Sequence, residues 1–67
     1  MTITVNEKEF NVSDTTSVSD LFDILDLGSS KGKAVAVNNH VVPKSKWDSH
    51  KLVLNDTILL IKATQGG

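Results

Sequence analysis

The last two residues of the sequence, Gly66 and Gly67, are the ones whose type and position could do chemistry. Glycine has no Cβ, so a glycyl end and its carboxylate can pass through a channel too narrow for other residues. A free carboxylate is a poor electrophile. Joined to AMP it becomes a mixed anhydride, which a sulfur nucleophile can convert to a thiocarboxylate. We therefore expect the carboxylate of Gly67 to react, with Gly66 and Gln65 threading into the active site of a partner.

Side chains offer little alternative chemistry. The chain has no cysteine, and its two histidines, His40 and His50, are far apart in sequence. Asp48 lies close to His50 in sequence, but such a pair is expected at the surface and is not enough for a metal or catalytic site. We therefore expect no catalytic residue, no metal site and no bound cofactor in this chain.

The first elements that must support this end are a hairpin and a helix. Residues 2–6 and 9–12 alternate polar and apolar, which predicts two strands joined by a turn at residues 6–8. Ser17 and Asp20 match a capping box, so a helix should begin there. We expect Gly28, in the left-handed conformation, to end this helix. Its apolar stripe, spaced i, i+3, i+4 and i+7, faces the sheet and consists of Val18, Leu21, Phe22 and Leu25.

A second hairpin and a last strand complete the pattern. Residues 33–37 and 40–42 read as strands, with Asn38 and Asn39 supplying the positive φ angles of a tight turn. Pro43 should end the second strand at a sheet edge, and residues 44–47 should form a short turn that tucks the Trp47 indole against the domain. Residues 55–56 form the last turn and residues 57–62 the last strand. Leu52 and Leu54 are expected to be minor core residues.

The order is therefore hairpin, helix, hairpin, strand. If the first and last strands lie side by side at the sheet centre, they run parallel, and the helix crosses one face in a right-handed connection. This predicts an α+β fold of the ubiquitin-like β-grasp type, with a mixed sheet of four to five strands and one main helix on one face. We expect residues 1–63 to form the domain and residues 64–67 to form a flexible tail.

The last strand also predicts an apolar surface beside the tail. Neighbouring side chains of a strand point to opposite faces, so one apolar set meets the helix and the other points outward. A contiguous apolar patch on so small a domain is typical of a docking surface. We assign Ile58, Leu60, Val35 and Val37 to the core, and Leu59, Ile61, Ala34 and Ala36 to an outward surface that docks a partner.

Composition excludes several other classes of protein. Sixty-seven residues fit a single domain, and the longest purely apolar runs are strand-sized, so we expect neither a signal peptide nor a membrane span. A chain without cysteine suits the cytoplasm. A nucleic-acid-binding protein would be expected to show clustered arginines and stacking aromatics, whereas this chain has no arginine, no tyrosine and one tryptophan.

Nearly the whole chain resembles the sulfur-carrier proteins of thiazole (thiamin) biosynthesis. The resemblance is carried by the length, by Ala-Val-Ala-Val-Asn at residues 34–38, and by the Ile-Leu-Leu-Ile strand at residues 58–61 before Gly66-Gly67. Residues 41–47 also look like the Val-Pro-(Arg or Lys)-x-x-Trp element of that family. Asn55-Asp56 departs from the pattern, because the family often has Gly-Asp there, but Asn also tolerates a positive φ.

This resemblance implies that Gly67 is adenylated by an enzyme related to the ubiquitin-activating ones, which uses ATP. Sulfur would then come by a cysteine desulfurase route and be delivered to thiazole synthase. The chain would be a carrier modified by its partners and not an enzyme, and Leu59 and Ile61 would sit in the docking surface. Two alternatives stay open: a carrier similar to the small subunit of molybdopterin synthase, and a β-grasp binding module with an inert tail.

Overall fold

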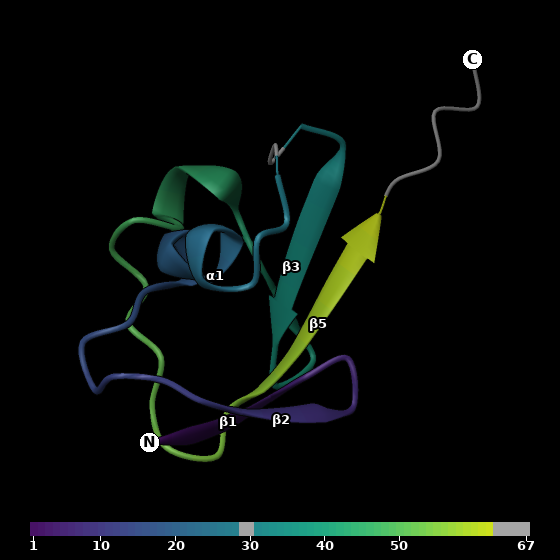
Figure 1. The fold of residues 1–67 in the computed structure, drawn as a ribbon. Coiled ribbons are helices and arrows are strands. Elements are labelled where there is room, and N and C mark those ends of the chain that lie inside the picture. The colour runs from purple at the N-terminus through teal and green to yellow at the C-terminus, as the bar shows by residue number, and fades with distance from the viewer. Residues whose placement is uncertain (29–30, 63–67) are drawn as a thin grey trace.

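The computed structural model describes residues 1–28 and 31–62. It contains one sheet of five strands, one α-helix and one short 3-10 helix (Figure 1). In chain order these elements are β1 (Thr2–Val5), β2 (Lys8–Asn11), α1 (Val18–Ile24), β3 (Lys33–Val37), β4 (His40–Val42), η1 (Lys44–Lys46) and β5 (Thr57–Lys62).

The strands are ordered β2-β1-β5-β3-β4 across the sheet. β1 and β5 run parallel near the centre, with Thr4 opposite Thr57 and Val5 opposite Ile58. The other neighbours are antiparallel, including β3 and β5 along the full length of β3. This mixed sheet with one α-helix confirms the predicted α+β architecture of the ubiquitin-like β-grasp type.

Both hairpins turn through pairs of residues with positive φ. Asn6 and Glu7 have φ of 49° and 72°, and Asn38 and Asn39 have φ of 50° and 69°. Two consecutive residues in this region form the tight turn whose twist suits a two-residue hairpin, so the prediction at Asn38-Asn39 is confirmed. Asn55 has φ of 70°, so this asparagine adopts the left-handed conformation that was expected to be tolerated at the last turn.

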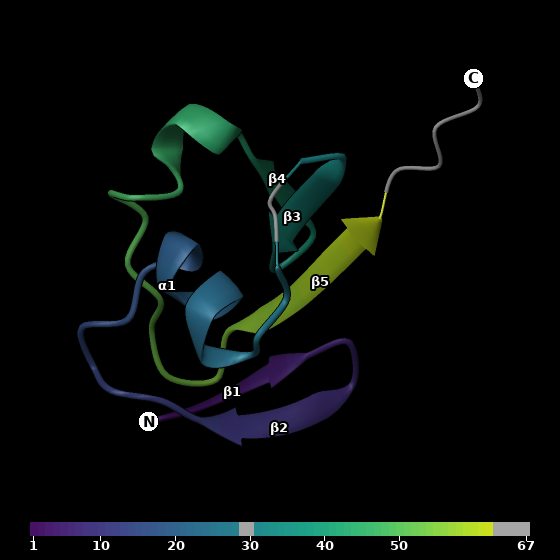
Figure 2. The same ribbon diagram turned by 45° about the horizontal axis from the view of Figure 1, so that its top comes forward.

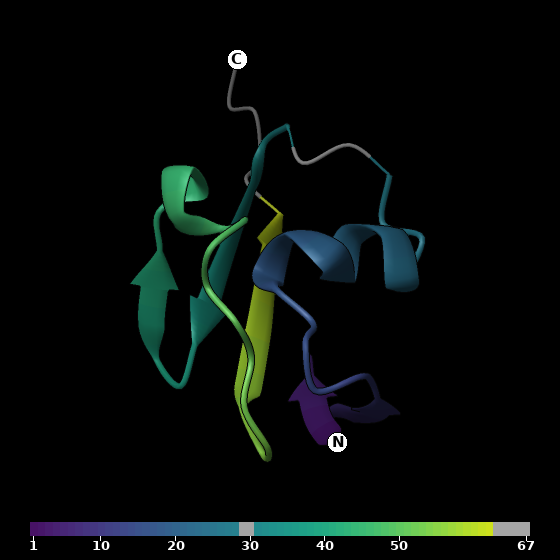
Figure 3. The same ribbon diagram turned by 90° about the vertical axis from the view of Figure 1, so that its left-hand side faces the viewer.

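The helix covers one face of the sheet. α1 and η1 lie on the same side of β3 and β5 in Figure 1, and in front of them in Figure 3. The helix contributes Val18, Leu21 and Phe22 to a core that includes Ile3, Val35 and Ile58 from the sheet. Leu25 is half-buried and packs against this core, so it is a weaker member of the predicted stripe.

The N-terminus of α1 has the predicted capping box. The backbone N–H of Asp20 donates to Ser17 Oγ at 3.2 Å, and the backbone N–H of Ser17 donates to Asp20 Oδ2 at 3.0 Å. These bonds satisfy donors that the first helical turn leaves free. The Ser17 backbone N–H, and after it the Ser17 hydroxyl, lower the pKa of Asp20 below its usual value.

The C-terminus of α1 corrects one prediction, because the left-handed residue that ends the helix is Asp26 and not Gly28. Asp26 has φ of 53°, and its N–H donates to Asp23 O at 3.3 Å. The N–H of Leu27 donates to Phe22 O at 2.9 Å, which completes the hydrogen bonding of a Schellman motif. Gly28 also has a positive φ, of 75°, but follows this motif.

Asp26→Gly should therefore stabilise the protein. Asp tolerates the left-handed conformation at some cost, and glycine removes that cost at the price of a more flexible unfolded chain, so we expect a net gain of about 0.5 kcal/mol. For a domain of this size this raises the midpoint of thermal unfolding by roughly 2–4 °C. The matched control is Asp23→Gly inside α1, which should lower the midpoint, and a lower midpoint for Asp26→Gly would contradict the assignment.

Trp47 is tucked against the domain as predicted. Its side chain is 4% exposed, its ring stacks on Phe22 with centroids 4.9 Å apart, and its Nε1 donates to Val42 O at 2.9 Å. Leu52, expected as a minor core residue, is fully buried at 2% exposure, whereas Leu54 is 61% exposed. The prediction for Leu54 is therefore wrong, because the chain turns at residues 54–55 and leaves this side chain outside the core.

Candidate functional site

The strand that leads to Gly66-Gly67 is β5, which lies inside the sheet between β1 and β3. It runs to Lys62, the last residue that the structure describes. Gln65, Gly66 and Gly67 lie outside the described residues, so their predicted roles in threading and reaction stay predictions. What the structure defines is the strand that carries them.

Polar side chains fix the start of β5. Asp56 is 4% exposed, and its Oδ1 accepts from Asn38 Nδ2 while its Oδ2 accepts from the backbone N–H of Val53, both at 2.9 Å. The Oδ1 of Asn38 in turn accepts from the backbone N–H of Thr57 at 2.9 Å. The turn of the second hairpin is thus tied to the first residue of β5. Sequence reasoning identified both turns but not this network.

The N-terminal hairpin supports β5 further along. The parallel pairing of β1 with β5 covers only Thr57 and Ile58. Two residues further along β5, β1 no longer pairs with it. There the side chain of Asn6 provides a hydrogen bond in place of the strand, because its Oδ1 accepts from the backbone N–H of Leu60 at 2.8 Å. A side chain thus holds β5 beyond the point where β1 turns away.

The apolar side chains of β5 divide between the two faces of the sheet. Ile58 is 1% exposed and Leu60 packs against the core, on the side of α1. Leu59 and Ile61 are 51% and 41% exposed. In Figure 1 this outer face is the side of β5 that carries no helix. Leu59 and Ile61 therefore lie on the surface as predicted, while their role in docking stays a prediction.

The prediction that Ala36 is exposed on this surface is wrong, because its side chain is only 7% exposed. It lies opposite Leu59 of β5 and Val41 of β4, so the larger side chains on both sides cover its single methyl group. Ala34 lies opposite Ile61 and is half-buried. The alanines therefore form the floor between larger residues and offer little contact area themselves.

Val41 is a member of this surface that sequence reasoning missed. It is 68% exposed and lies on the same face as Leu59, on the other side of Ala36. The signal was present in the sequence, because a two-residue turn at Asn38-Asn39 places Val41 opposite Ala36. We call Val41, Leu59, Ile61, Ala34 and Ala36 the outer patch.

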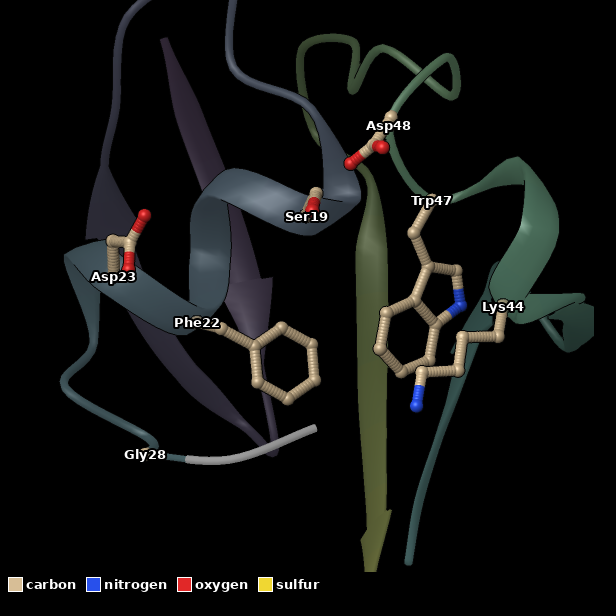
Figure 4. Close-up of a pocket in the computed structure, with 7 residues that line it drawn as sticks. All are labelled: Ser19, Phe22, Asp23, Gly28, Lys44, Trp47 and Asp48. Carbon is tan, nitrogen blue, oxygen red and sulfur yellow. The ribbon is translucent and has the colours of Figure 1, made fainter. Parts of the chain in front are cut away.

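A concave region lies on the side of the sheet that the helix covers, around the stacked rings of Phe22 and Trp47 (Figure 4). It has a volume of about 330 Å³, and its rim carries Asp23 and Asp48. Lys44 extends along the indole, with Nζ 6.0 Å from the ring centroid. Because both rings are almost fully buried, this region holds the helix against η1 and presents little ring surface to a ligand.

Residues 1–28 and 31–62 contain no group of three or more His, Asp or Glu side chains that could hold a metal ion. His40 is exposed, and its Nδ1 lies 3.1 Å from Asn38 O. Within the same part of the chain, no helix is long and apolar enough to cross a membrane.

Comparison with known proteins identifies the relatives of this chain. The model of the ThiS family matches residues 1–67. The sulfur carrier protein ThiS of Escherichia coli (strain K12) is 31% identical over 67 residues, which cover 100% of both chains.

Two solved structures of a thiamine biosynthesis protein from Geobacter metallireducens are also similar, both at 23% identity. The crystal structure, of a protein designated ThiS, has a TM-score of 0.87 with both chains covered completely. The solution NMR structure has a TM-score of 0.78 and covers 100% of this chain and 88% of the other. These structures support the fold. The match to the family model over the whole sequence and the E. coli relative show that the chain belongs to the ThiS family.

Proposed function

We propose that this chain is a sulfur carrier of thiamin biosynthesis, and that the group that carries sulfur is the carboxylate of Gly67. The observation that carries the proposal is the alignment with the E. coli sulfur carrier protein, which covers both chains completely. Membership of the ThiS family favours this function over a carrier of the molybdopterin type. The chain itself then supplies no catalytic residue, and partner enzymes modify it.

The reaction has two steps. A carboxylate oxygen of Gly67 attacks the α-phosphorus of ATP, pyrophosphate leaves, and a glycyl adenylate forms on an activating enzyme of the kind that activates ubiquitin. A sulfide equivalent from a cysteine desulfurase route then attacks the carbonyl carbon, and AMP leaves with the bonding electron pair. The product is a thiocarboxylate, from which thiazole synthase takes the sulfur. A reaction that consumes ATP in this way suits the cytoplasm.

The structural argument for this proposal is that hydrogen bonds from two hairpin turns fix the position of β5, the strand that leads to Gly67. Asp56 and Asn38 hold the start of the strand and Asn6 holds its later part, so the position of Lys62 is set by the folded domain. Gly67 follows Lys62 by five residues, a stretch that can span about 16 Å when extended. The domain can therefore bind the surface of a partner while Gly66 and Gly67 enter its active site.

The test is intact-mass analysis of the protein co-expressed with an adenylating enzyme and a cysteine desulfurase. We expect a mass increase equal to the difference between one sulfur and one oxygen atom, located at Gly67 by fragmentation. A carrier known to be modified under the same conditions serves as the positive control. An unchanged mass beside a modified control would favour the β-grasp binding module with an inert tail.

The outer patch gives a prediction about docking. Leu59→Asp should slow thiocarboxylate formation by about thirtyfold, because a buried apolar contact at the centre of an interface is worth about 2 kcal/mol. Leu59 is 51% exposed in the free protein, so the change should leave the protein folded and lower the unfolding midpoint by about 4–8 °C, because aspartate is disfavoured within a strand by up to about 1 kcal/mol. The measurement is the rate of modification by mass spectrometry, together with thermal unfolding.

The matched control for this prediction is Val53→Asp, since Val53 is 60% exposed but lies in the loop before β5. It adds the same charge at a similarly exposed apolar site. Equal rates for the two variants would remove the outer patch from the docking surface.

A further inference from the structure

A groove on the opposite side of the molecule from the outer patch is not used by the proposed function. It lies between the C-terminal end of α1 and the hairpin of β1 and β2, which are adjacent in Figure 2. Its volume is about 430 Å³, and its apolar lining includes Phe10, Ile24, Leu25, Leu27 and Leu60. Ile24 is 50% exposed, which is unusual for a large aliphatic residue within a helix that packs on a sheet. The groove thus leaves apolar surface uncovered.

The groove runs beside a free strand edge. β2 is the outermost strand of the sheet. Among the described residues only β1 pairs with it, which leaves its other edge unpaired. The N–H of Val12 donates to Met1 O at 2.8 Å, so the alternate residues Phe10 and Lys8 also direct their backbone groups toward β1. Glu9 and Asn11 therefore present their N–H and C=O groups to the free edge, where an added strand could bond to them.

The charges of the groove have one sign. Among residues 1–28 and 31–62, Lys8 is the only charged residue that lines it, and Lys8 forms no ion pair with any of these residues. A smaller hollow of about 160 Å³ shares Leu27 and Leu60 with the groove and continues it toward the end of β5. Its charged lining residues are Lys33 and Lys62. Among the described residues, no carboxylate lines either hollow.

We propose that this groove binds an extended segment of a partner protein that adds to β2 as a further strand. The segment carries two apolar residues at alternate positions, which pack on Phe10 and Ile24. It carries an acidic residue at the next position of the same face, which pairs with Lys8. The groove lies on the helix face of the sheet, and of the outer patch only Ile61 lines its continuation, so a partner bound in the groove leaves Leu59 and Val41 free for a second one. The proposal does not depend on the chemistry at Gly67.

The probe is a blocked peptide of sequence Asp-Ser-Val-Ser-Val-Ser-Asp, which places both valines and both carboxylates on one face in either strand direction. We expect it to shift the backbone amide signals of residues 8–11 and 24–27 of the isotope-labelled protein. Hydrogen exchange at Glu9 and Asn11 should slow on binding. The same peptide with lysine in place of aspartate should bind about tenfold more weakly.

Paired variants separate the groove from nonspecific binding. Ile24→Asp should remove binding, whereas Leu54→Asp, at a 61% exposed leucine outside the groove, should not. Lys8→Glu should reverse the preference between the aspartate and lysine peptides, whereas Lys46→Glu, at an exposed lysine of η1, should leave it unchanged. Thermal unfolding confirms that each variant is folded.

Three results would overturn the assignment of this groove as the binding site. These are an absence of shifts with the aspartate peptide, shifts confined to the outer patch, and equal affinity for the two peptides. Binding in the groove without slower exchange at Glu9 and Asn11 would also exclude strand addition, and with it the proposed mode.

Discussion

Gly66→Val should reduce thiocarboxylate formation at Gly67 by about a hundredfold or more, since a misplacement of about 1 Å at a reacting group can cost that much. Valine adds a branched side chain next to the reacting glycine, at the position where the proposed channel needs the slimmest residue. The fold should be unaffected, because the buried core of the described residues reaches no further along the sequence than Ile58. The measurement is the fraction of modified protein over time by intact mass.

The matched control for Gly66→Val is Thr64→Val, which places the same side chain two residues earlier and should be modified at close to the normal rate. A variant with one tryptophan added after Gly67 should not be modified at all, because its terminal carboxylate no longer belongs to glycine. If Gly66→Val or the extended protein were activated as fast as the unchanged protein, the narrow-channel argument would fail. Loss of modification in Thr64→Val would place the constriction nearer to β5.

The parts of the fold that depend on local chemistry could be predicted from the sequence. Asn38-Asn39 turns the chain because asparagine tolerates two consecutive positive φ angles. Ser17 and Asp20 begin α1 because their side chains reach backbone donors three residues away. These elements then leave few ways to order the strands, since a helix that connects parallel strands crosses with one hand.

The errors arose where the outcome depends on neighbours that are distant in sequence or on competition between nearby residues. Ala36 has the outward alternation that was predicted, but its burial is set by Leu59 and Val41 on the adjacent strands. Gly28 is the better left-handed residue, yet the Schellman bonds form earlier, where Asp26 follows the last helical turn. Alternation and residue preference alone did not contain this information.

The candidate site divides in the same way. The outward direction of Leu59 and Ile61 follows from strand alternation, so the sequence was enough to find them. The bonds that Asn6 makes to Leu60, and that Asn38 makes to Asp56 and Thr57, could not be predicted, because each joins a hairpin turn to a segment that only the completed sheet brings close. Sequence therefore identified the outward residues of β5 and predicts a reaction at Gly67 that the described residues do not test, and the structure added what supports β5.

Trp47→Ala should cost about 3–5 kcal/mol of unfolding free energy, because it removes a large, almost fully buried side chain. The indole stacks on Phe22 and donates to Val42 O, so it joins α1 to the end of β4. A chain of 67 residues has a total stability of roughly 3–10 kcal/mol, so this single change consumes a large part of it. The measurement is urea unfolding followed by circular dichroism, since Trp47 is the only tryptophan and its fluorescence is lost with it.

Two further variants divide the contribution of Trp47 into its parts. Trp47→Phe keeps a ring to stack on Phe22 but leaves the carbonyl of Val42 without its donor, so the expected cost is about 1–2 kcal/mol. Leu54→Ala removes a side chain that is 61% exposed and should change stability by less than about 0.5 kcal/mol. If Trp47→Ala cost no more than Leu54→Ala, the indole would not be packed as described. If Trp47→Phe cost as much as Trp47→Ala, the hydrogen bond to Val42 O and not the stacking on Phe22 would account for the contribution of Trp47.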